Sequence, residues 1–569
     1  MIDVVATAAI GPLGEGDAFV VGAPNAPAPT CITLDPRLTA AGLRRPFAAR
    51  SSVAEAAREA GEDPATTLLL AVVRQVSAQL SPGERVGLAI GTSSGGMATS
   101  ERFFRARATG EAIDPALADA ATYHAPFRAL LATLSAEGIE PVRTTHLLTA
   151  CSASTLALGL GVMWLEQDLC DVVLAGGYDA LTTFVAAGFE ALGATTSRLP
   201  PRPFRVDRDG MALGEGAGVM ALRRVFPGRV ARIVGFGASC DAVHLTAPDR
   251  TGGGLSRAAL QALAEDAPVD LVSVHGTSTV FNDPMESKAL ALALPGKSPP
   301  VHAAKASIGH TLGAAGVLES ILVIDALRRG LLPATPGEGA LDPEVGAHPC
   351  TENAPADVRG ALKLSAAFGG ANAALHFVRA DFAGPRTARP LVTPRRLAEA
   401  VPTTYELEAL SASTGLARDR LARMDGLCHR ALAAVGALAA VVGREALVGA
   451  GIVVGTVLAT LDLNAVYEAG LAARGAAFAE GRRFAYTTPN ACAGECAMAF
   501  RLTGPAMTVS RGLDARLEAR EVAADFLATR RAQRVVVVSV DAPGPCAELV
   551  LEKTGWPVDF QARAELWGI

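Results

Sequence analysis

The chain has 569 residues, of which half are hydrophobic and only 5% are aromatic, with a formal net charge of −6 and a pI near 5.9. This acidic balance without a basic stripe argues against a nucleic-acid-binding protein, and the length exceeds that of one ordinary core. The abundance of Gly and Ala predicts a multi-unit α/β protein whose helices pack closely on sheets.

The first residues and the cysteines indicate the compartment. Residues 1–11 carry Asp3 and lack the basic flank and apolar core of a secretory signal. The nine cysteines show no spacing typical of a disulfide framework or a zinc site. The longest apolar run, residues 431–442, is far shorter than a membrane span of about 20 residues. We therefore expect a soluble cytoplasmic protein that binds neither membrane nor metal.

Strands alternate with helices in the first part of the chain, which we take as a unit of residues 1–228. Residues 85–96 read as an apolar strand followed by Gly-Thr. Residues 143–180 read as a β-rich run, a corner of small residues, a helix and a second apolar strand. This alternation predicts mixed or parallel sheets with helices on their faces.

Cys151 lies at the corner of small residues, where an apolar run gives way to a helix. A strand–corner–helix junction exposes a nucleophile, and a helix N-terminus favours the thiolate form of a cysteine. The alternative is a small buried hydrophobe, because free cysteine is among the most buried residue types. The corner alone therefore makes Cys151 only a candidate.

Two histidines stand at the ends of predicted elements in a second unit, residues 229–384. His275 closes an apolar strand before a Gly-Thr-Ser turn, and His310 lies between a glycine and a Gly/Ala-rich helix start. Residues at such ends project into the crevice where α/β proteins bind ligands. A lone histidine is more often structural, but two in glycine-framed corners favour a site. Lys305 could set the hydrogen bonding or charge of His310.

The last part of the chain repeats the pattern of the first. Residues 449–460 read like residues 85–96 at a shift of 364 positions. Residues 505–542 follow the order of residues 143–180 at a shift of 362 positions. Two near-equal shifts over distant blocks predict a duplicated half-unit, which we place at residues 400–569.

The duplicated segment has no nucleophile at the corresponding corner. At the 362-residue shift Cys151 corresponds to Leu513, which cannot attack a carbonyl. Residues 546–553 are expected to match the strand near Gly216, and nothing after them resembles the histidine motifs. Residues 385–399, with two prolines and several basic residues, predict a linker before this truncated, catalytically silent copy.

Five motifs, in order along the chain, resemble the β-ketoacyl-acyl carrier protein synthase family. They are Thr149-Ala150-Cys151-Ser152, the stretch from Arg202-Pro203-Phe204 to Gly216-Ala217-Gly218, His275-Gly276-Thr277-Ser278-Thr279, Lys305 with Gly309-His310-Thr311, and Phe368-Gly369-Gly370-Ala371-Asn372. The resemblance covers residues 1 to about 384 and implies a thiolase-like five-layer α-β-α-β-α sandwich. Residues 400–569 resemble an additional thiolase-like half of the chain-length-factor type.

The resemblance assigns the acyl-binding roles to Cys151 and Phe368. Cys151 would take an acyl chain from a carrier-protein thioester, and the backbone N–H groups of both residues would form the oxyanion hole. Phe368 would also gate the acyl pocket. Ala367 and Ala371 stand where the family has Gly and Thr, which restricts the backbone of the gate loop.

The resemblance assigns decarboxylation to the two histidines. His275 and His310 would donate hydrogen bonds to the malonyl thioester carbonyl as carbon dioxide leaves, and Lys305 and Glu319 would support His310. Thiolases of this superfamily have a second cysteine in place of one histidine, so the His-His pair implies an elongating enzyme. No cofactor is implied.

The implied function is a β-ketoacyl synthase reaction, the decarboxylative Claisen condensation of an acyl thioester with malonyl-acyl carrier protein. It would serve fatty acid, polyene or polyketide biosynthesis. Two alternatives stay open: a non-elongating scaffold that binds acyl carrier protein and keeps a vestigial condensing site, and an acyltransferase that acts without decarboxylation.

The implied partner is an acyl carrier protein loaded with acyl and malonyl groups. The small basic clusters around Arg44 and Arg202 could dock it, although solvated surface charge is the simpler interpretation. The third segment is expected to act as a built-in dimer partner, with residues 144–149 pairing with residues 506–511. A homodimer of the whole chain is the other arrangement.

Overall fold

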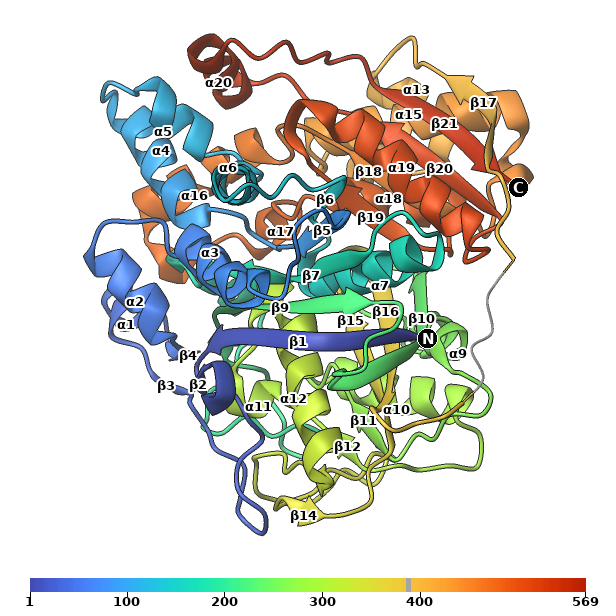
Figure 1. The fold of residues 1–569 in the computed structure, drawn as a ribbon. Helices are drawn as coiled ribbons and strands as arrows, with labels where there is room; N and C mark the ends of the chain where they lie inside the picture. The colour runs from blue at the N-terminus through green and yellow to red at the C-terminus, as the bar shows by residue number, and fades with distance from the viewer. Residues whose placement is uncertain (385–389) are drawn as a thin grey trace.

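The structure is a computed structural model that describes residues 1–384 and 390–569. In Figure 1 three groups of strands appear one below the other. The C-terminal part of the chain, in orange and red, is at the top, the N-terminal part is in the middle, and the green and yellow middle part of the chain is at the bottom. Their strands are joined edge to edge, so that the described residues form one continuous 16-stranded sheet. Among the described helices, none is long and apolar enough to cross a membrane.

The first sheet is built from the N-terminal part of the chain. Its strand order is β6 (Arg143–Leu147), β5 (Val86–Gly91), β7 (Val172–Asp179), β9 (Gly216–Arg223) and β1 (Ile2–Gly11). The first three strands are parallel, and β9 runs antiparallel to both neighbours. Helix α3 (Pro64–Ser77) covers the outer face and packs on α6 (Ala125–Ala136).

The second sheet is built from the middle part of the chain, residues 231–379. Its order is β12 (Val301–His302), β11 (Leu271–Ser273), β15 (Gly360–Ala366), β16 (Ala371–Arg379) and β10 (Ala231–Cys240). The outer face is covered by α9 (Gly253–Ala262), which packs on α10 (Asn282–Ala293). The start of β10 pairs with the start of β1, and this pairing joins the two sheets at one corner.

Two helices lie between these sheets and touch both. They are α7 (Ala153–Glu166) and α12 (Ala315–Arg329). Residues 153–165 of α7 are all buried, which explains why its sequence is apolar on every face. Gly159 of α7 has no room for a side chain, because an added Cβ would lie 2.2 Å from the ring of Phe236. The predicted five-layer α-β-α-β-α sandwich is therefore confirmed.

The third sheet repeats the topology of the first. Its order is β19 (Ala506–Val509), β18 (Gly451–Gly455), β20 (Arg534–Ser539), β21 (Arg563–Gly568) and β17 (Arg395–Ala400). Strand directions also recur, with three parallel strands followed by antiparallel β21 and β17. Helix α19 (Ala515–Ala528) takes the place of α7, and α15 (Gly426–Val442) takes the place of α3.

One buried aspartate makes the same bonds in both copies. Asp179 accepts hydrogen bonds from Thr92 Oγ1 and from the backbone N–H groups of Ser93 and Ser94. Asp541, 362 residues later, accepts the corresponding bonds from the side chain and backbone of residues 456–458. The agreement extends to individual atoms, which supports the duplication that the two sequence shifts indicated.

Two sequence expectations about the third segment are wrong. Residues 395–399 of the expected linker belong to β17, and residues 385–389 of it lie outside the described residues. Because β17 is an edge strand, its charged residues face solvent and resemble a linker in the sequence. Residues 546–553 lie in helix α20 (Pro545–Thr554), not in a strand; a proline at its first turn and a glycine at its end delimit this helix.

The first and third sheets meet through β6 and β19. These strands pair antiparallel at Leu147 and Val509. The N–H of Leu148 donates to Thr508 O at 2.8 Å, and the N–H of Ser510 donates to His146 O at 2.9 Å. Of the predicted pairing of residues 144–149 with residues 506–511, the structure shows the middle part, residues 146–148 with 508–510, and this contact extends one sheet across both copies (Figure 1).

Candidate active site

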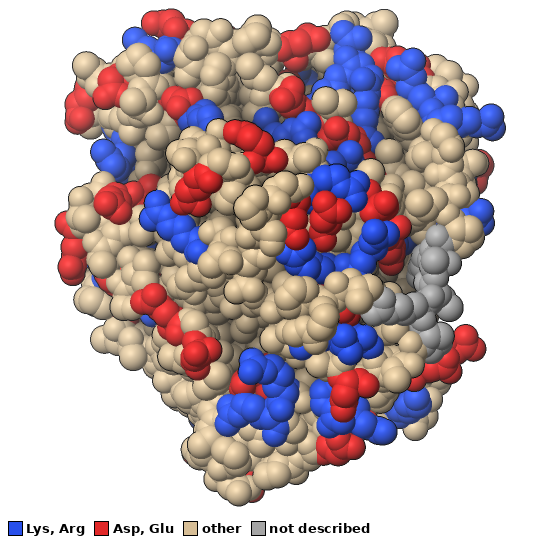
Figure 2. All heavy atoms as spheres, viewed as in Figure 1, with Lys and Arg blue, Asp and Glu red and all other residues tan. Residues whose placement is uncertain are grey.

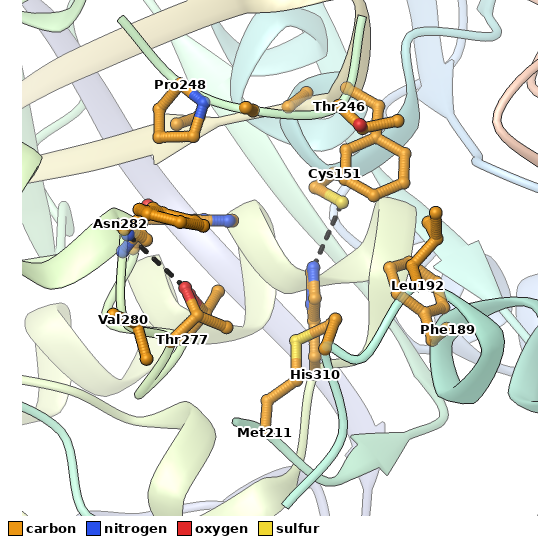
Figure 3. A pocket seen from close by; sticks show the side chains of 18 of the residues that line it. Cys151, Phe189, Leu192, Met211, Thr246, Pro248, Thr277, Val280, Asn282 and His310 are labelled. Atoms are coloured by element: carbon orange, nitrogen blue, oxygen red, sulfur yellow. Dashed lines mark hydrogen bonds between the residues drawn. The ribbon is translucent and has the colours of Figure 1, made fainter. Parts of the chain in front are cut away.

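Cys151, His275 and His310 line one cavity of about 320 Å³. Cys151 Sγ lies 3.0 Å from His310 Nε2, and the two imidazole rings stand edge to face with centroids 5.4 Å apart. Figure 3 shows the sulfur pointing at the His310 ring, with Thr246 and Pro248 above them in this view. The fold thus brings together the three residues that the sequence motifs singled out.

The corner before α7 holds Cys151 in place at a cost in backbone strain. A short 3-10 turn (Ala150–Ser152) leads into the helix, and Ala150 has a φ of +44°. A left-handed conformation costs a non-glycine residue about 1–2 kcal/mol. The corresponding residue of the third unit is Gly512, with a φ of +66°, which is unstrained there. The strain is confined to the copy that carries the cysteine, as is common at functional sites.

Burial dominates the protonation of Cys151. The side chain is only 5% exposed, and desolvation raises the pKa of its thiol to about 12 although Lys305 opposes this rise. The helix N-terminus was expected to favour a thiolate. Burial acts in the opposite direction and favours the neutral thiol, because loss of water destabilises the thiolate.

His310 is a neutral hydrogen-bond donor. Its backbone is fixed to the first unit by bonds to Ala212 O and from the N–H of Gly214. The N–H of Leu312 donates to Nδ1 at 3.2 Å, which places the ring proton of the neutral form on Nε2, opposite Cys151. Burial, and then the charge of Lys305, hold the pKa of His310 well below its usual range.

His275 is held at the end of β11 by a buried carboxylate of α10. Glu286 accepts the backbone N–H groups of His275 and Gly276, both at 2.6 Å. Burial, and then the nearby charge of Lys305, place the pKa of His275 well below its usual range. Both imidazoles are therefore neutral and able to donate into the cavity.

Glu319 lies between two buried lysines. Lys305 Nζ is 2.6 Å from one carboxylate oxygen, and Lys363 Nζ is 2.8 Å from the other. Burial raises the pKa of Glu319, but the two lysines lower it further, so the net shift is downward. Lys363 was missed by the sequence reasoning; its signal is a lone lysine within the apolar strand β15.

Phe368 stands at the boundary between the main cavity and a smaller space behind it. Its ring lies 5.5 Å from that of Phe189, and the N–H of the following Gly369 donates to Leu245 O at 2.7 Å. Gly369 and Gly370 have φ values near +79° and +77°, which require glycine. Ala367 has an extended backbone, so alanine causes no strain at that position.

The smaller space, about 20 Å³, reaches from Cys151 to the third unit. The ring of Phe484 in the third unit lies 5.3 Å from Phe189. Residues from all three units line this space: Ser93, Ser94, Met97, Tyr123, Ala150, Cys151, Phe184, Val185, Phe189, Phe368, Phe484, Thr487 and Thr488. No motif in the sequence marks residues 484–488, so their place beside the cysteine emerges only from the fold.

Comparison with protein families gives two matches. The family described as "Beta-ketoacyl synthase, N-terminal domain" matches residues 56–225, and "Beta-ketoacyl synthase, C-terminal domain" matches residues 230–337. A curated relative, the 3-oxoacyl-[acyl-carrier-protein] synthase 2 of Mycobacterium tuberculosis, is 32% identical over 250 residues, which are 41% of this chain. The chain spans about 60% of the length of that relative.

Two solved structures extend the comparison. The ishigamide ketosynthase/chain length factor is 28% identical with a TM-score of 0.60, over 66% of this chain and 98% of that one. The PfaC keto synthase-chain length factor is 19% identical with a TM-score of 0.78, and it covers 100% of this chain and 78% of its own. The second likeness concerns the fold alone, and it includes the duplicated third sheet.

Proposed function

We propose that the chain, which matches the two β-ketoacyl synthase family models over residues 56–225 and 230–337, catalyses a decarboxylative Claisen condensation. The substrates would be an acyl thioester and a malonyl thioester, both carried by acyl carrier protein, and the product a 3-oxoacyl thioester. The observation that carries this proposal is the contact of Cys151 Sγ with His310 Nε2 at 3.0 Å beside His275 in one buried cavity.

In the first half-reaction Cys151 takes the acyl group. The thiol loses its proton and attacks the thioester carbonyl, and the pantetheine thiol of the carrier leaves with a proton. His310 stabilises the thiolate by donation from Nε2. It does not take the thiol proton, because Nδ1 already accepts the N–H of Leu312. The backbone N–H groups of Cys151 and Phe368 receive the developing oxyanion.

In the second half-reaction the histidines act on the malonyl thioester. His275 and His310 donate to its thioester carbonyl, so that the electron pair of the breaking carbon–carboxylate bond is held as an enolate while carbon dioxide leaves. The enolate carbon attacks the acyl-Cys151 carbonyl and releases the sulfur. Lys305 and Glu319 support His310, and Lys363 joins them as the second cation on Glu319.

The third unit completes the acyl site in this proposal. Residues 1–228 and 229–384 form the synthase, and the third sheet replaces a second subunit at β6. Phe484 closes the space behind Cys151 at about 20 Å³, which favours a short acyl group while Phe368 is closed. A short first substrate is therefore part of the proposal.

The test measures two products separately in wild type, Cys151→Ala and His310→Ala: acyl-enzyme by mass spectrometry, and carbon dioxide from malonyl-acyl carrier protein. We expect Cys151→Ala to lose acyl-enzyme yet still release carbon dioxide. We expect His310→Ala to lose decarboxylation by roughly 10²-fold or more. Leu513→Ala, at the corresponding corner of the third unit, is the matched control and should equal wild type.

Each alternative function gives its own result. An acyltransferase would form acyl-enzyme, and its wild type would release no more carbon dioxide than His310→Ala does. A vestigial carrier-protein-binding scaffold would give neither product in the wild type. Either result would contradict the condensing role proposed for Cys151, His275 and His310.

A further inference from the structure

The loop that carries Phe368 is held by the third unit as well as by its own. Asn490 Nδ2 donates to Phe368 O at 2.7 Å. Within the synthase part, the loop is also held by the N–H of Gly369 on Leu245 O and by Asn372 Nδ2 on Asp241 Oδ1, both at 2.7 Å. The bond from Asn490 is thus a contact from outside the synthase to the backbone of the gate residue itself.

Asn490 occupies a position where its side chain has an ordinary alternative partner. It is the N-cap residue of α18 (Ala491–Phe500), and asparagine is among the preferred caps because its side chain accepts a free backbone N–H. Here the side chain makes no such bond. It is buried, at 2% exposure, and its Oδ1 has no partner among the described residues. The amide is therefore committed to the Phe368 carbonyl at the expense of the helix cap.

The packing around this bond leaves little freedom. A Cβ added at Gly369 would lie 2.8 Å from Asn490 Nδ2, and a Cβ added at Gly494 of α18 would lie 2.8 Å from Gly369 Cα. The first turn of α18 therefore rests directly on the backbone of the gate loop. A shift of the Phe368 backbone out of its present place turns the Phe368 carbonyl and breaks the bond from Asn490.

Phe368, Phe189 and Cys151 line both cavities, the large one and the small one behind it. The Phe368 ring therefore separates the two spaces. An acyl chain longer than the small space allows needs this ring to move. The bond that fixes the Phe368 carbonyl thereby also controls how readily the space behind Cys151 opens.

We propose that Asn490 is a positioning residue that holds the Phe368 gate closed from the third unit. The duplicated half thus acts on the opening of the acyl site as well as on its shape. The role for an acyl substrate rests on the proposed function. The positioning of the gate does not, and it is tested without any catalytic turnover.

The test compares two reagents that alkylate Cys151, measured by mass spectrometry at fixed pH. Iodoacetamide fits the main cavity, whereas the chain of N-octyl iodoacetamide enters the small space behind Cys151 only if Phe368 moves. We expect Asn490→Ala and Asn490→Asp to raise the octyl-to-parent rate ratio by roughly fivefold, the factor that one lost hydrogen bond gives. Asn490→Asp keeps the shape and cannot donate, so it serves if the alanine variant does not fold.

Glu166→Gln is the matched control, because it weakens another contact of the third unit, the pair with Arg531 at 2.6 Å, away from the gate. Its rate ratio should equal that of wild type. An unchanged or lower ratio in both folded Asn490 variants would overturn the proposal, and so would an equal rise in Glu166→Gln. If the wild type fails in the condensation assay but the Asn490 variants raise the octyl-to-parent rate ratio, the proposed function is rejected and the positioning role of Asn490 stands.

Discussion

At the scale of residues, the site depends on buried charges that stand close to two neutral histidines. Lys305 and Lys363 share the single carboxylate of Glu319. Both lysines lower the pKa of His310, after the larger effect of burial. The cations thus help to keep the imidazole neutral, which is the form that donates from Nε2 to a carbonyl oxygen.

Lys363→Met tests this electrostatic role. Removing a cation near His310 raises the pKa of its imidazole, so the protonated, inactive form persists to higher pH. We expect the acid limb of decarboxylation to move to higher pH, while the rate near neutral pH, above that limb, changes little. A pH–rate profile of carbon dioxide release measures both effects. Lys363→Arg keeps the charge and is the control; coincident profiles for the methionine variant and wild type would contradict the idea.

At the scale of elements, two helices related by the duplication pack against each other with buried carboxylates between them. They are α4 (Met97–Thr109) and α16 (Leu461–Arg474). Arg105 of α4 bonds Glu101 at 3.2 Å and Glu468 of α16 at 3.0 Å. Burial, followed by repulsion from Glu468, raises the pKa of Glu101 to about 7.

This raised pKa predicts that stability decreases with pH. Folding favours the protonated form of Glu101, so its contribution is complete below about pH 4.5 and is lost as the pH rises through about 7. Between pH 5 and pH 8.5 the free energy of unfolding should decrease in both proteins. We expect this decrease to be roughly 2–3 kcal/mol smaller in Glu101→Gln than in wild type. Urea unfolding at both pH values gives the comparison. Equal decreases of the free energy of unfolding in Glu101→Gln and wild type would refute this role of Glu101. The control is Glu111→Gln, at an exposed position, which should show the same pH dependence as wild type.

At the scale of the whole molecule, the third unit differs from the first in that no second sheet among the described residues covers α19. Its counterpart α7 is buried between two sheets, whereas Leu513 and Leu517 beside or within α19 are about half exposed. Arg516 and Arg520 pair with Glu565 of β21. Figure 2 shows charges of both signs gathered over this part of the surface. Ion pairs and solvent therefore replace the missing second half.

The two copies are joined by more than one strand pair. Asp525 of α19 is buried and accepts Arg143 Nη2 at 2.9 Å, Trp164 Nε1 at 2.8 Å and Gln167 Nε2 at 3.1 Å from the first unit. At the corresponding position the first copy has Met163. This cluster breaks the symmetry of the duplication and ties the third unit to the helix that begins beside Cys151.

Asp525→Ala leaves three donors of the first unit without their acceptor. Loss of one partner of a buried charged network typically costs about 3–5 kcal/mol. Because one sheet runs through all units, we expect a single calorimetric transition at lower temperature, not the early melting of the third unit alone. Two separated transitions would show that the units unfold independently. Asp514→Ala, exposed at the start of the same helix, is the control and should leave the midpoint unchanged.

The sequence alone indicated the order of the motifs, the candidate nucleophile Cys151, the two candidate histidines and the duplication, because each rests on residues that are close in the chain or on a constant shift. The strand pairing between residues 144–149 and 506–511 was implied by the family resemblance together with this shift. The edge strand β17 was missed because its charged residues look like a linker. Helix α20 was mistaken for a strand because an apolar run does not reveal its period over eight residues.

Only the tertiary structure decided which distant residues meet at Cys151. Phe484 and Asn490 have no local signature, since an aromatic residue in a short helix and an asparagine at a helix N-cap are ordinary features, and the lone lysine of β15, Lys363, is the one signal that the sequence offered. The protonation of Cys151 was also decided there, because the helix N-terminus visible in the sequence favours thiolate while burial favours the thiol. Burial depends on the packing of the whole chain, and that packing placed the third unit against the gate.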